Sequence, residues 1–183
     1  MRLFIAVRLP VELQRALGEA SRALACQCSS GDFSREENYH ITLAFLGERQ
    51  GAQLAPLQAA MDAAASRASA FDFEIGGLGC FRREGGLVLW VGVPRGAQQL
   101  TQLYRLLCVS LAPCGFTPED RVYTPHLTLA RRALPEAGFE RLAAEAAVPP
   151  LRARAGALSL MKSERINGRL VYTEIYSSIL KEG

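Results

Sequence analysis

Histidine and lysine are scarce in this chain. Its 183 residues include two histidines, His40 and His126, and only two of the 21 basic residues are lysines, so arginine supplies nearly all the positive charge. Cysteine occurs five times, an odd number, without a CxxC pair or a Cys/His cluster. This spacing argues against a disulfide framework and against a zinc site. Free thiols in a reducing cytosol are expected instead.

Long apolar stretches and a strong excess of one charge are also lacking. No segment approaches the length of a membrane span, and the apolar run within Met1–Arg8 is too short for a signal peptide. We therefore expect a cytoplasmic protein without a membrane partner. The net charge of +3 argues against wrapping long nucleic acid, which needs a broad basic face. Nothing in the sequence points to an obligate protein partner.

Strands and helices are expected to alternate. Segments that are rich in β-branched or aromatic residues, or bounded by Gly and Pro, predict strands at Leu3–Leu9, Ile41–Leu46, Phe71–Ile75, Leu87–Val93, Leu127–Ala130, Leu151–Met161 and Leu170–Ile179. Apolar residues at helical spacing, or abundant alanine, predict helices at Pro10–Cys26, Ala52–Ala70, Ala97–Leu111 and Phe139–Ala147. The alternation indicates a mixed α/β or α+β protein.

The sequence pattern repeats with an offset of 86 residues. This offset places His40–Leu43 on His126–Leu129, so that two His-x-Thr-Leu motifs coincide, and Leu3–Val7 on Leu89–Val93. A five-residue apolar match is weak alone, but its sharing one offset with the histidine motif favours a duplication. We expect residues 1–183 to form one domain of two related lobes, which can exchange terminal strands, with a small-ligand site in the cleft between them.

The two His-x-Thr motifs suit the opening of a cyclic phosphate. Residues i and i+2 of a strand share a face, so His40 lies beside Thr42 and His126 beside Thr128. Hydrolysis requires one group to take a proton from water and another to give one to the departing ribose oxygen. Histidine can do either near neutral pH because its ordinary pKa is ~6.5, and the threonine hydroxyls can donate hydrogen bonds to phosphate oxygens.

Simpler interpretations compete with this one. A lone histidine on a strand is more often structural than catalytic, and threonine is common in strands for packing reasons alone. A metal site is disfavoured because two histidines without a third ligand seldom suffice. The occurrence of both histidines in one motif at repeat-related positions favours catalysis. The pseudo-symmetry leaves the acid and base roles exchangeable.

At these motifs the chain resembles the 2H phosphoesterase superfamily, in particular the RNA 2′,3′-cyclic phosphodiesterases that were historically named 2′-5′ RNA ligases. The matching segments are Arg2–Val7, Asn38–Gly47, Leu89–Val93 and Pro125–Arg131, in the expected order over nearly the whole chain. The resemblance implies a bilobal α+β fold, with two antiparallel sheets, outer helices and a central cleft. It also implies hydrolysis of RNA 2′,3′-cyclic phosphate ends to 2′-phosphates without a metal or other cofactor.

The resemblance further assigns roles to residues. It makes His40 the proton donor and His126 the proton acceptor, and it matches Thr42 and Thr128 to phosphate-binding threonines. Arg131 matches an arginine that often follows the second motif and can hold phosphate through two hydrogen bonds, with Arg132 the weaker alternative. The expected ligands are RNA ends or small cyclic-phosphate nucleotides.

Three aromatic residues near the motifs are candidates for stacking on a nucleobase. Tyr39 and Tyr123 flank the starts of the two motif strands and are expected at the rim of the site. Phe45 is five positions after His40, so in a regular strand it faces the core.

Two alternative functions stay open. The same site could act on another cyclic phosphate or on a 2′,5′-linked oligonucleotide. A non-catalytic module that binds RNA ends is a hypothesis of another class, although binding alone does not require two titrating groups.

Overall fold

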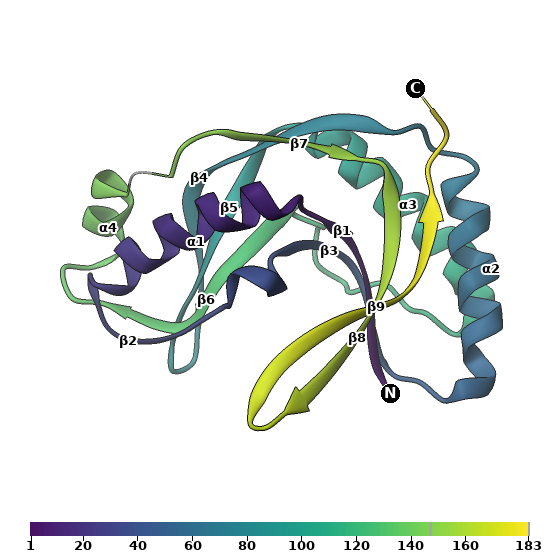
Figure 1. Cartoon of the computed structure of the whole chain (residues 1–183), viewed down its shortest axis with the longest axis horizontal. Helices are drawn as coiled ribbons and strands as arrows, with labels where there is room; N and C mark the ends of the chain where they lie inside the picture. Colours follow the sequence, from purple (N-terminus) through teal and green to yellow (C-terminus); the bar gives the residue numbers. More distant parts are fainter. Residues whose placement is uncertain (147, 183) are drawn as a thin grey trace.

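The computed structural model describes residues 1–146 and 148–182 (Figure 1). Its strands are β1 (Arg2–Arg8), β2 (Cys28–Phe33), β3 (His40–Glu48), β4 (Phe71–Arg83), β5 (Gly86–Arg95), β6 (His126–Pro135), β7 (Leu151–Ala155), β8 (Ala157–Ile166) and β9 (Arg169–Ile179). Its α-helices are α1 (Val11–Ala25), α2 (Leu54–Ala65), α3 (Ala97–Leu111) and α4 (Phe139–Glu145), with short 3₁₀ turns η1 (Glu36–Asn38), η2 (Gly51–Gln53) and η3 (Ala112–Cys114).

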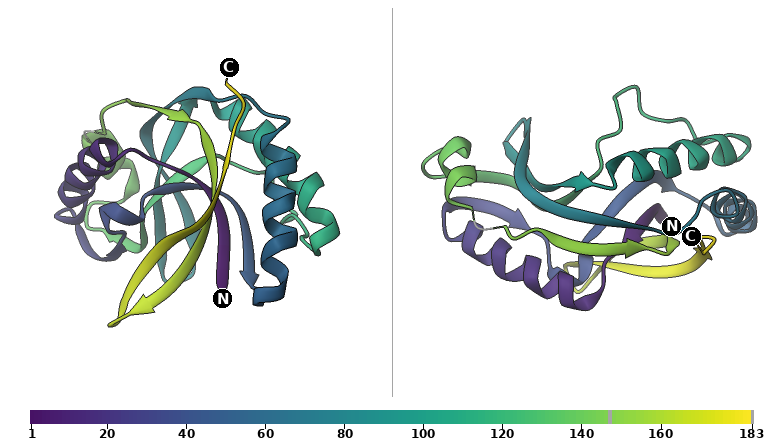
Figure 2. Two further views of the ribbon diagram at one scale, coloured as in Figure 1. Left: turned by 45° about the vertical axis from the view of Figure 1, so that its right-hand side comes forward. Right: turned by 90° about the horizontal axis from the view of Figure 1, so that it is seen from above.

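The described residues form two antiparallel sheets. One has the strand order β3-β1-β8-β9 and the other the order β2-β6-β5-β4-β7, and neighbouring strands in both sheets run antiparallel. Helices are packed on the outside of these sheets (Figures 1 and 2). The predicted α+β class with two antiparallel sheets is therefore confirmed.

The 86-residue offset recurs in the order of the elements. Helix α3 begins and ends 86 residues after α1, and β4 and β8 begin 86 residues apart, as do β3 and β6. Strand β4 pairs with β5 of the second half, whereas β8 pairs with β1 of the first half. Each sheet thus contains at least two strands from each half of the chain, which interlocks the halves. The duplication itself stays a prediction.

One hydrophobic core lies between the two sheets and the helices that cover them. Alternate residues of β1, Leu3, Ile5 and Val7, are buried in it. Helices α2 and α3 pack against each other, as Figure 2 shows, and α3 also contacts β3. The other face of β1 carries Phe4 and Ala6, which form a small separate cluster with Met161. Period-2 alternation along β1 therefore separates a core face from a second, partly apolar face.

Several boundaries differ from the predicted ones. The predicted strand Leu151–Met161 is divided at Gly156, where the chain leaves one sheet and enters the other. Strand β4 continues eight residues beyond Ile75, through a glycine-rich stretch with register shifts. The predicted helix Ala52–Ala70 is shorter, because η2 precedes it and Ser66 caps it. Ala147, the predicted last residue of the fourth helix, lies outside the described residues, as does Gly183 of the expected domain.

Strand β2 was not predicted at all. Its sequence, Cys-Ser-Ser-Gly-Asp-Phe, is polar, and its four central residues are exposed. It exists because its backbone pairs with β6 at the edge of the larger sheet. Among the described residues, no helix is both long and apolar enough to cross a membrane.

Candidate active site

His40 is the first residue of β3 and its imidazole is held at both nitrogens. Nδ1 lies 2.6 Å from the backbone carbonyl oxygen of Asn38, and Nε2 lies 2.9 Å from Oγ1 of Thr42. A carbonyl oxygen can only accept, so Nδ1 carries the proton and donates it. In the neutral ring Nε2 is then the acceptor for the Thr42 hydroxyl.

His126 begins β6 and is held in the same way on one side. Its Nδ1 lies 2.7 Å from the carbonyl oxygen of Thr124, which again precedes the histidine by two residues. The Nδ1–H donors of both histidines are therefore occupied by backbone, and Nε2 is in each case the atom left for chemistry. The two His-x-Thr motifs therefore hold their histidines in the same local way, through a carbonyl oxygen two residues earlier.

Aromatic rings flank both imidazoles. The ring centroid of Phe4 lies 4.7 Å from that of His40, and the ring of Tyr172 meets His40 edge-on at 5.3 Å. Phe81 meets His126 edge-on at 5.1 Å, and Trp90 lies 5.9 Å away.

Sequence reasoning did not identify these four aromatic residues. Phe4 and Trp90 are 86 positions apart, so the repeat could have suggested them. Tyr172 and Phe81 lie on β9 and β4, and no local pattern predicts that these strands run beside the motif strands.

Contacts connect the two strands that begin with the histidines. Strands β3 and β6 are in different sheets but contact each other. The hydroxyl of Tyr123, in the segment before β6, donates a 2.9 Å hydrogen bond to the carbonyl oxygen of Thr42. His126 and Arg131 both contribute electrostatically to the lowering of the His40 pKa.

Both imidazoles are easier to deprotonate than in water. Burial, opposed by the Asn38 hydrogen bond and assisted by Arg131 and His126, lowers the pKa of His40 from 6.5 to about 4. Burial also lowers the pKa of His126, with smaller contributions in the same direction from Arg121 and Arg131. Both rings are therefore neutral at pH 7 in the free protein.

A β-bulge follows the threonine in each motif strand. In β3, Ala6 pairs with Thr42 and Ile5 with Ala44, so Leu43 is the extra residue. In β6, Leu129 is skipped in the same way. A bulge inserts one residue and reverses the parity of everything that follows. After Thr42 the strand therefore returns to its histidine face at Phe45, one residue later than the position at which a regular strand would return.

The expectation that Phe45 faces the core is wrong for this reason. Leu43 and Ala44 are both buried, whereas Phe45 is 53% exposed, with its ring centroid 6.2 Å from that of Phe4. Phe45 therefore lies on the same side of β3 as His40. The 86-residue offset aligns Arg131 with Phe45. Arg131 is also exposed.

The predicted phosphate ligands lie near the histidines to different degrees. Thr42 contacts His40 directly, and Thr128 is half-buried two residues after His126 on the same strand. Arg131 lowers the pKa of both histidines by its charge. Arg132 has a positive φ of 51° and forms an ion pair with Asp32 of β2, so its guanidinium is already engaged.

The two tyrosines predicted at the rim are placed differently. Tyr39 is 2% exposed and belongs to the main core, so its ring is not available to a nucleobase and this prediction is corrected. Tyr123 is half-buried, its ring is stacked on Tyr104 with centroids 4.3 Å apart, and its hydroxyl is bound to β3. It is better described as a link between the halves than as a stacking platform.

The described residues contain no group of three or more His, Cys, Asp or Glu side chains that could hold a metal ion. Two surface hollows of the described residues include neither histidine: one lies between α4 and the start of β2, and the other lies along α3. The expected central cleft therefore stays a prediction.

The comparison with known proteins decides the family. A model described as the 2′-5′ RNA ligase superfamily matches residues 9–167, which is most of the chain. The chain belongs to this superfamily.

Members of this superfamily resemble the chain in sequence and in structure. An RNA 2′,3′-cyclic phosphodiesterase of Geobacillus stearothermophilus is 36% identical over 138 residues, or 75% of this chain and 44% of that protein. A protein of the same name from Thermotoga maritima is 26% identical over 184 residues, covering 100% of this chain and 97% of the relative. The structure of Escherichia coli LigT in complex with 3′-AMP has a TM-score of 0.76 at 27% identity, covering 99% of this chain and 98% of that one.

The chain thus spans less than half of the Geobacillus relative and nearly all of the Thermotoga relative. The resemblance to the 2H phosphoesterases is confirmed, as is the identification of the chain as an enzyme of this superfamily. The roles of individual residues are a separate matter.

Proposed function

We propose that this protein hydrolyses RNA 2′,3′-cyclic phosphate ends to 2′-phosphates without a metal, with His40 as proton donor and His126 as proton acceptor. The observation that supports this most directly is the common anchoring of the two rings. Each donates Nδ1–H to a carbonyl oxygen two residues earlier, at 2.6 and 2.7 Å. Each therefore keeps Nε2 for proton transfer.

The two imidazoles supply the two proton transfers that hydrolysis needs. His126 accepts a proton from water as the water oxygen attacks phosphorus, and the bond from phosphorus to O3′ breaks. His40 gives a proton to the departing O3′, which leaves the phosphate on O2′. One positioned acid or base typically contributes ~10²–10⁴-fold to the rate.

The lowered pKa of His40 is compatible with its role as the donor. In the free protein this pKa is about 4, so the ring is neutral and Nε2 accepts from Thr42. A bound cyclic phosphate is an anion, and a nearby opposite charge raises the pKa of an imidazole. Substrate binding therefore promotes protonation of Nε2, the state in which His40 can act as the acid.

Arg131 and the two motif threonines are the proposed phosphate ligands. Arginine has a planar fork of donors that fits two phosphate oxygens at once. Its charge lowers the pKa of both histidines, which supports its placement in the same site. Thr42 and Thr128 can donate to the remaining oxygens, where charge collects in the transition state.

Aromatic side chains are candidates for holding the terminal nucleoside. Phe45 is exposed on the His40 side, and Phe81 is half-buried beside His126, with the guanidinium of Arg83 5.7 Å from its ring centroid. Stacking of a base on such a ring contributes about 1–3 kcal/mol. The bound 3′-AMP of the LigT structure supports a nucleotide of this size as ligand.

The decisive experiment is a product assay in EDTA. An RNA oligonucleotide ending in a 2′,3′-cyclic phosphate is incubated with the wild-type protein and with His40→Ala and His126→Ala variants, and 2′- and 3′-monophosphate ends are separated. We expect only 2′-phosphate from the wild type and a loss of at least about 10²-fold in each variant. Near-normal activity in either variant contradicts the histidine mechanism, and activity that requires added metal contradicts metal independence. Tight binding without product identifies a binding module instead.

A further inference from the structure

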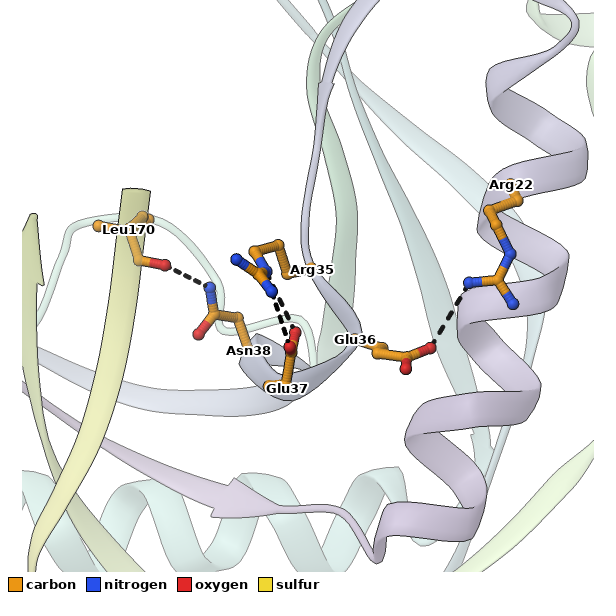
Figure 3. A network of polar contacts seen from close by, with 6 residues as sticks. All are labelled: Arg22, Arg35, Glu36, Glu37, Asn38 and Leu170. Carbon is orange, nitrogen blue, oxygen red and sulfur yellow. Dashed lines mark hydrogen bonds and ion pairs between the residues drawn. The ribbon is translucent and has the colours of Figure 1, made fainter. Parts of the chain in front are cut away.

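The 3₁₀ turn η1, directly before His40, is attached to the fold on two sides. Towards α1, the guanidinium of Arg22 lies 3.6 Å from the carboxylate of Glu36. Towards the β8–β9 hairpin, the side-chain amide of Asn38 donates a 2.9 Å hydrogen bond to the carbonyl oxygen of Leu170 (Figure 3). The turn therefore joins a helix of the first half to strands of the second.

Asn38 is bonded through its side chain and through both of its backbone polar groups. Its backbone N–H donates to the carbonyl oxygen of Arg35 at 3.0 Å, and its own carbonyl oxygen accepts Nδ1–H of His40 at 2.6 Å. The next residue, Tyr39, is buried in the core. A rotation of the Asn38 peptide would move the carbonyl that holds His40. The amide on one side and the buried tyrosine on the other oppose that rotation.

The β8–β9 hairpin supports His40 a second time. Tyr172, two residues after Leu170 on β9, presents its ring edge-on to the imidazole at 5.3 Å. His126 has a different environment, since Thr124 is exposed and, within the described part of the chain, its side chain forms no hydrogen bond. The two histidines share the bond at Nδ1, but among the described residues only one of the two carbonyl-bearing residues, Asn38, also has a side-chain hydrogen bond to another strand.

We propose that Asn38 is a positioning residue for His40, whose side-chain amide fixes the turn to the β8–β9 hairpin so that its own carbonyl keeps Nε2 directed at the scissile phosphate. This rests on the proposed function of His40. Removal of the amide leaves both imidazoles and the backbone carbonyl of residue 38 in the chain but allows the His40 imidazole to rotate. A displacement of about 1 Å at a reacting group can cost about 10²-fold in rate, and the loss is expected in kcat rather than in KM.

Two variants of one turn separate this role from a general effect on the fold. Asn38→Ala removes the amide, and Glu37→Ala is the matched control, because Glu37 lies in the same turn and its side chain binds the neighbouring exposed Arg35. Asn38→Asp adds a test of hydrogen bonding, because a carboxylate has nearly the shape of the amide but cannot donate to the Leu170 carbonyl.

The two-histidine composition makes the ring itself observable by ¹⁵N-edited NMR. The chain gives only two sets of imidazole signals, and those of His126 serve as an internal reference. In Asn38→Ala we expect the His40 Nδ1–H to exchange with water at least about tenfold faster, with His126 unchanged. We also expect kcat to fall about ten- to a hundredfold, with KM altered less than about threefold. Asn38→Asp should behave similarly, and Glu37→Ala should match the wild type.

A His40 Nδ1–H signal that is unchanged in Asn38→Ala, or a kcat within about twofold of the wild type, overturns the inference. An equal loss in Glu37→Ala also overturns it, because the effect would then belong to the turn as a whole. If the wild type fails to open a cyclic phosphate, the proposed function is wrong. The NMR comparison still decides whether Asn38 holds the ring.

Discussion

Acidification is expected to destabilise this protein through His40 in particular. The folded protein holds the pKa of this imidazole at about 4, against an ordinary value of 6.5. Between these values the unfolded chain binds a proton on His40 and the folded chain does not. Stability is therefore retained above pH 6.5 and declines as the pH falls towards 4, because the unfolded state binds more protons.

The size of this effect follows from the two pKa values. Each pH unit within the window corresponds to about 1.4 kcal/mol. At pH 5 the unfolded state gains about 2 kcal/mol relative to pH 7, and the gain approaches about 3 kcal/mol at pH 4. Other groups titrate in this range as well, so the measured quantity is the difference between wild type and His40→Gln, whose side chain is neutral at every pH.

Urea denaturation at pH 7, 6 and 5 measures this difference. Trp90 is the only tryptophan and lies 5.9 Å from His126, so its fluorescence reports on the site. We expect the stability of the wild type relative to His40→Gln to fall by about 2 kcal/mol between pH 7 and pH 5. A difference that does not vary with pH, or an NMR titration of His40 near 6.5, would refute the burial argument. His126→Gln should show a shift of the same sign.

Two further predictions concern the surroundings of the histidines. Arg131→Gln should reduce kcat/KM on a cyclic-phosphate RNA about 10–100-fold, as expected for loss of hydrogen bonds to a charged group, whereas Arg132→Gln should have little effect; equal losses would contradict the assignment of Arg131. A Cβ atom at Gly79 would lie 2.2–2.5 Å from atoms of the Trp90 ring, so Gly79→Ala should destabilise the fold by about 1–3 kcal/mol and alter Trp90 fluorescence. Gly51→Ala, where nothing lies within 4 Å of an added Cβ, is its control in thermal denaturation, and equal melting temperatures would contradict the steric reasoning.

The sequence was sufficient where local periodicity decides the structure. The stripe of Leu100, Leu103, Leu107 and Leu111 predicted α3 with both of its ends, and these leucines are all buried. The alternation in His-x-Thr placed each threonine on the face of its histidine, with the intervening Ile41 and Leu127 buried. These predictions depend on the regular geometry of a helix or strand over a few residues.

Sequence reasoning failed where a distant strand decided the outcome. The alternation of a regular strand predicted that Phe45 faces the core. This was wrong because pairing with β1 creates a bulge at Leu43, which the sequence of the segment does not reveal. Tyr39 was expected at the rim because it adjoins His40, but its side chain is buried in the core. Polar β2 has no alternating pattern to recognise, and only its partner β6 makes it a strand.

The sequence by itself determined the two histidine motifs, their 86-residue spacing and the elements that carry them, because each depends on short-range geometry. It left the two histidines equivalent. Tertiary structure alone decided that Arg131 acts on both rings and that Tyr172 and Leu170 of β9 support only the His40 side. The β9 contacts depend on the pairing of β1 with β8, between residues more than a hundred positions apart, which no local pattern specifies.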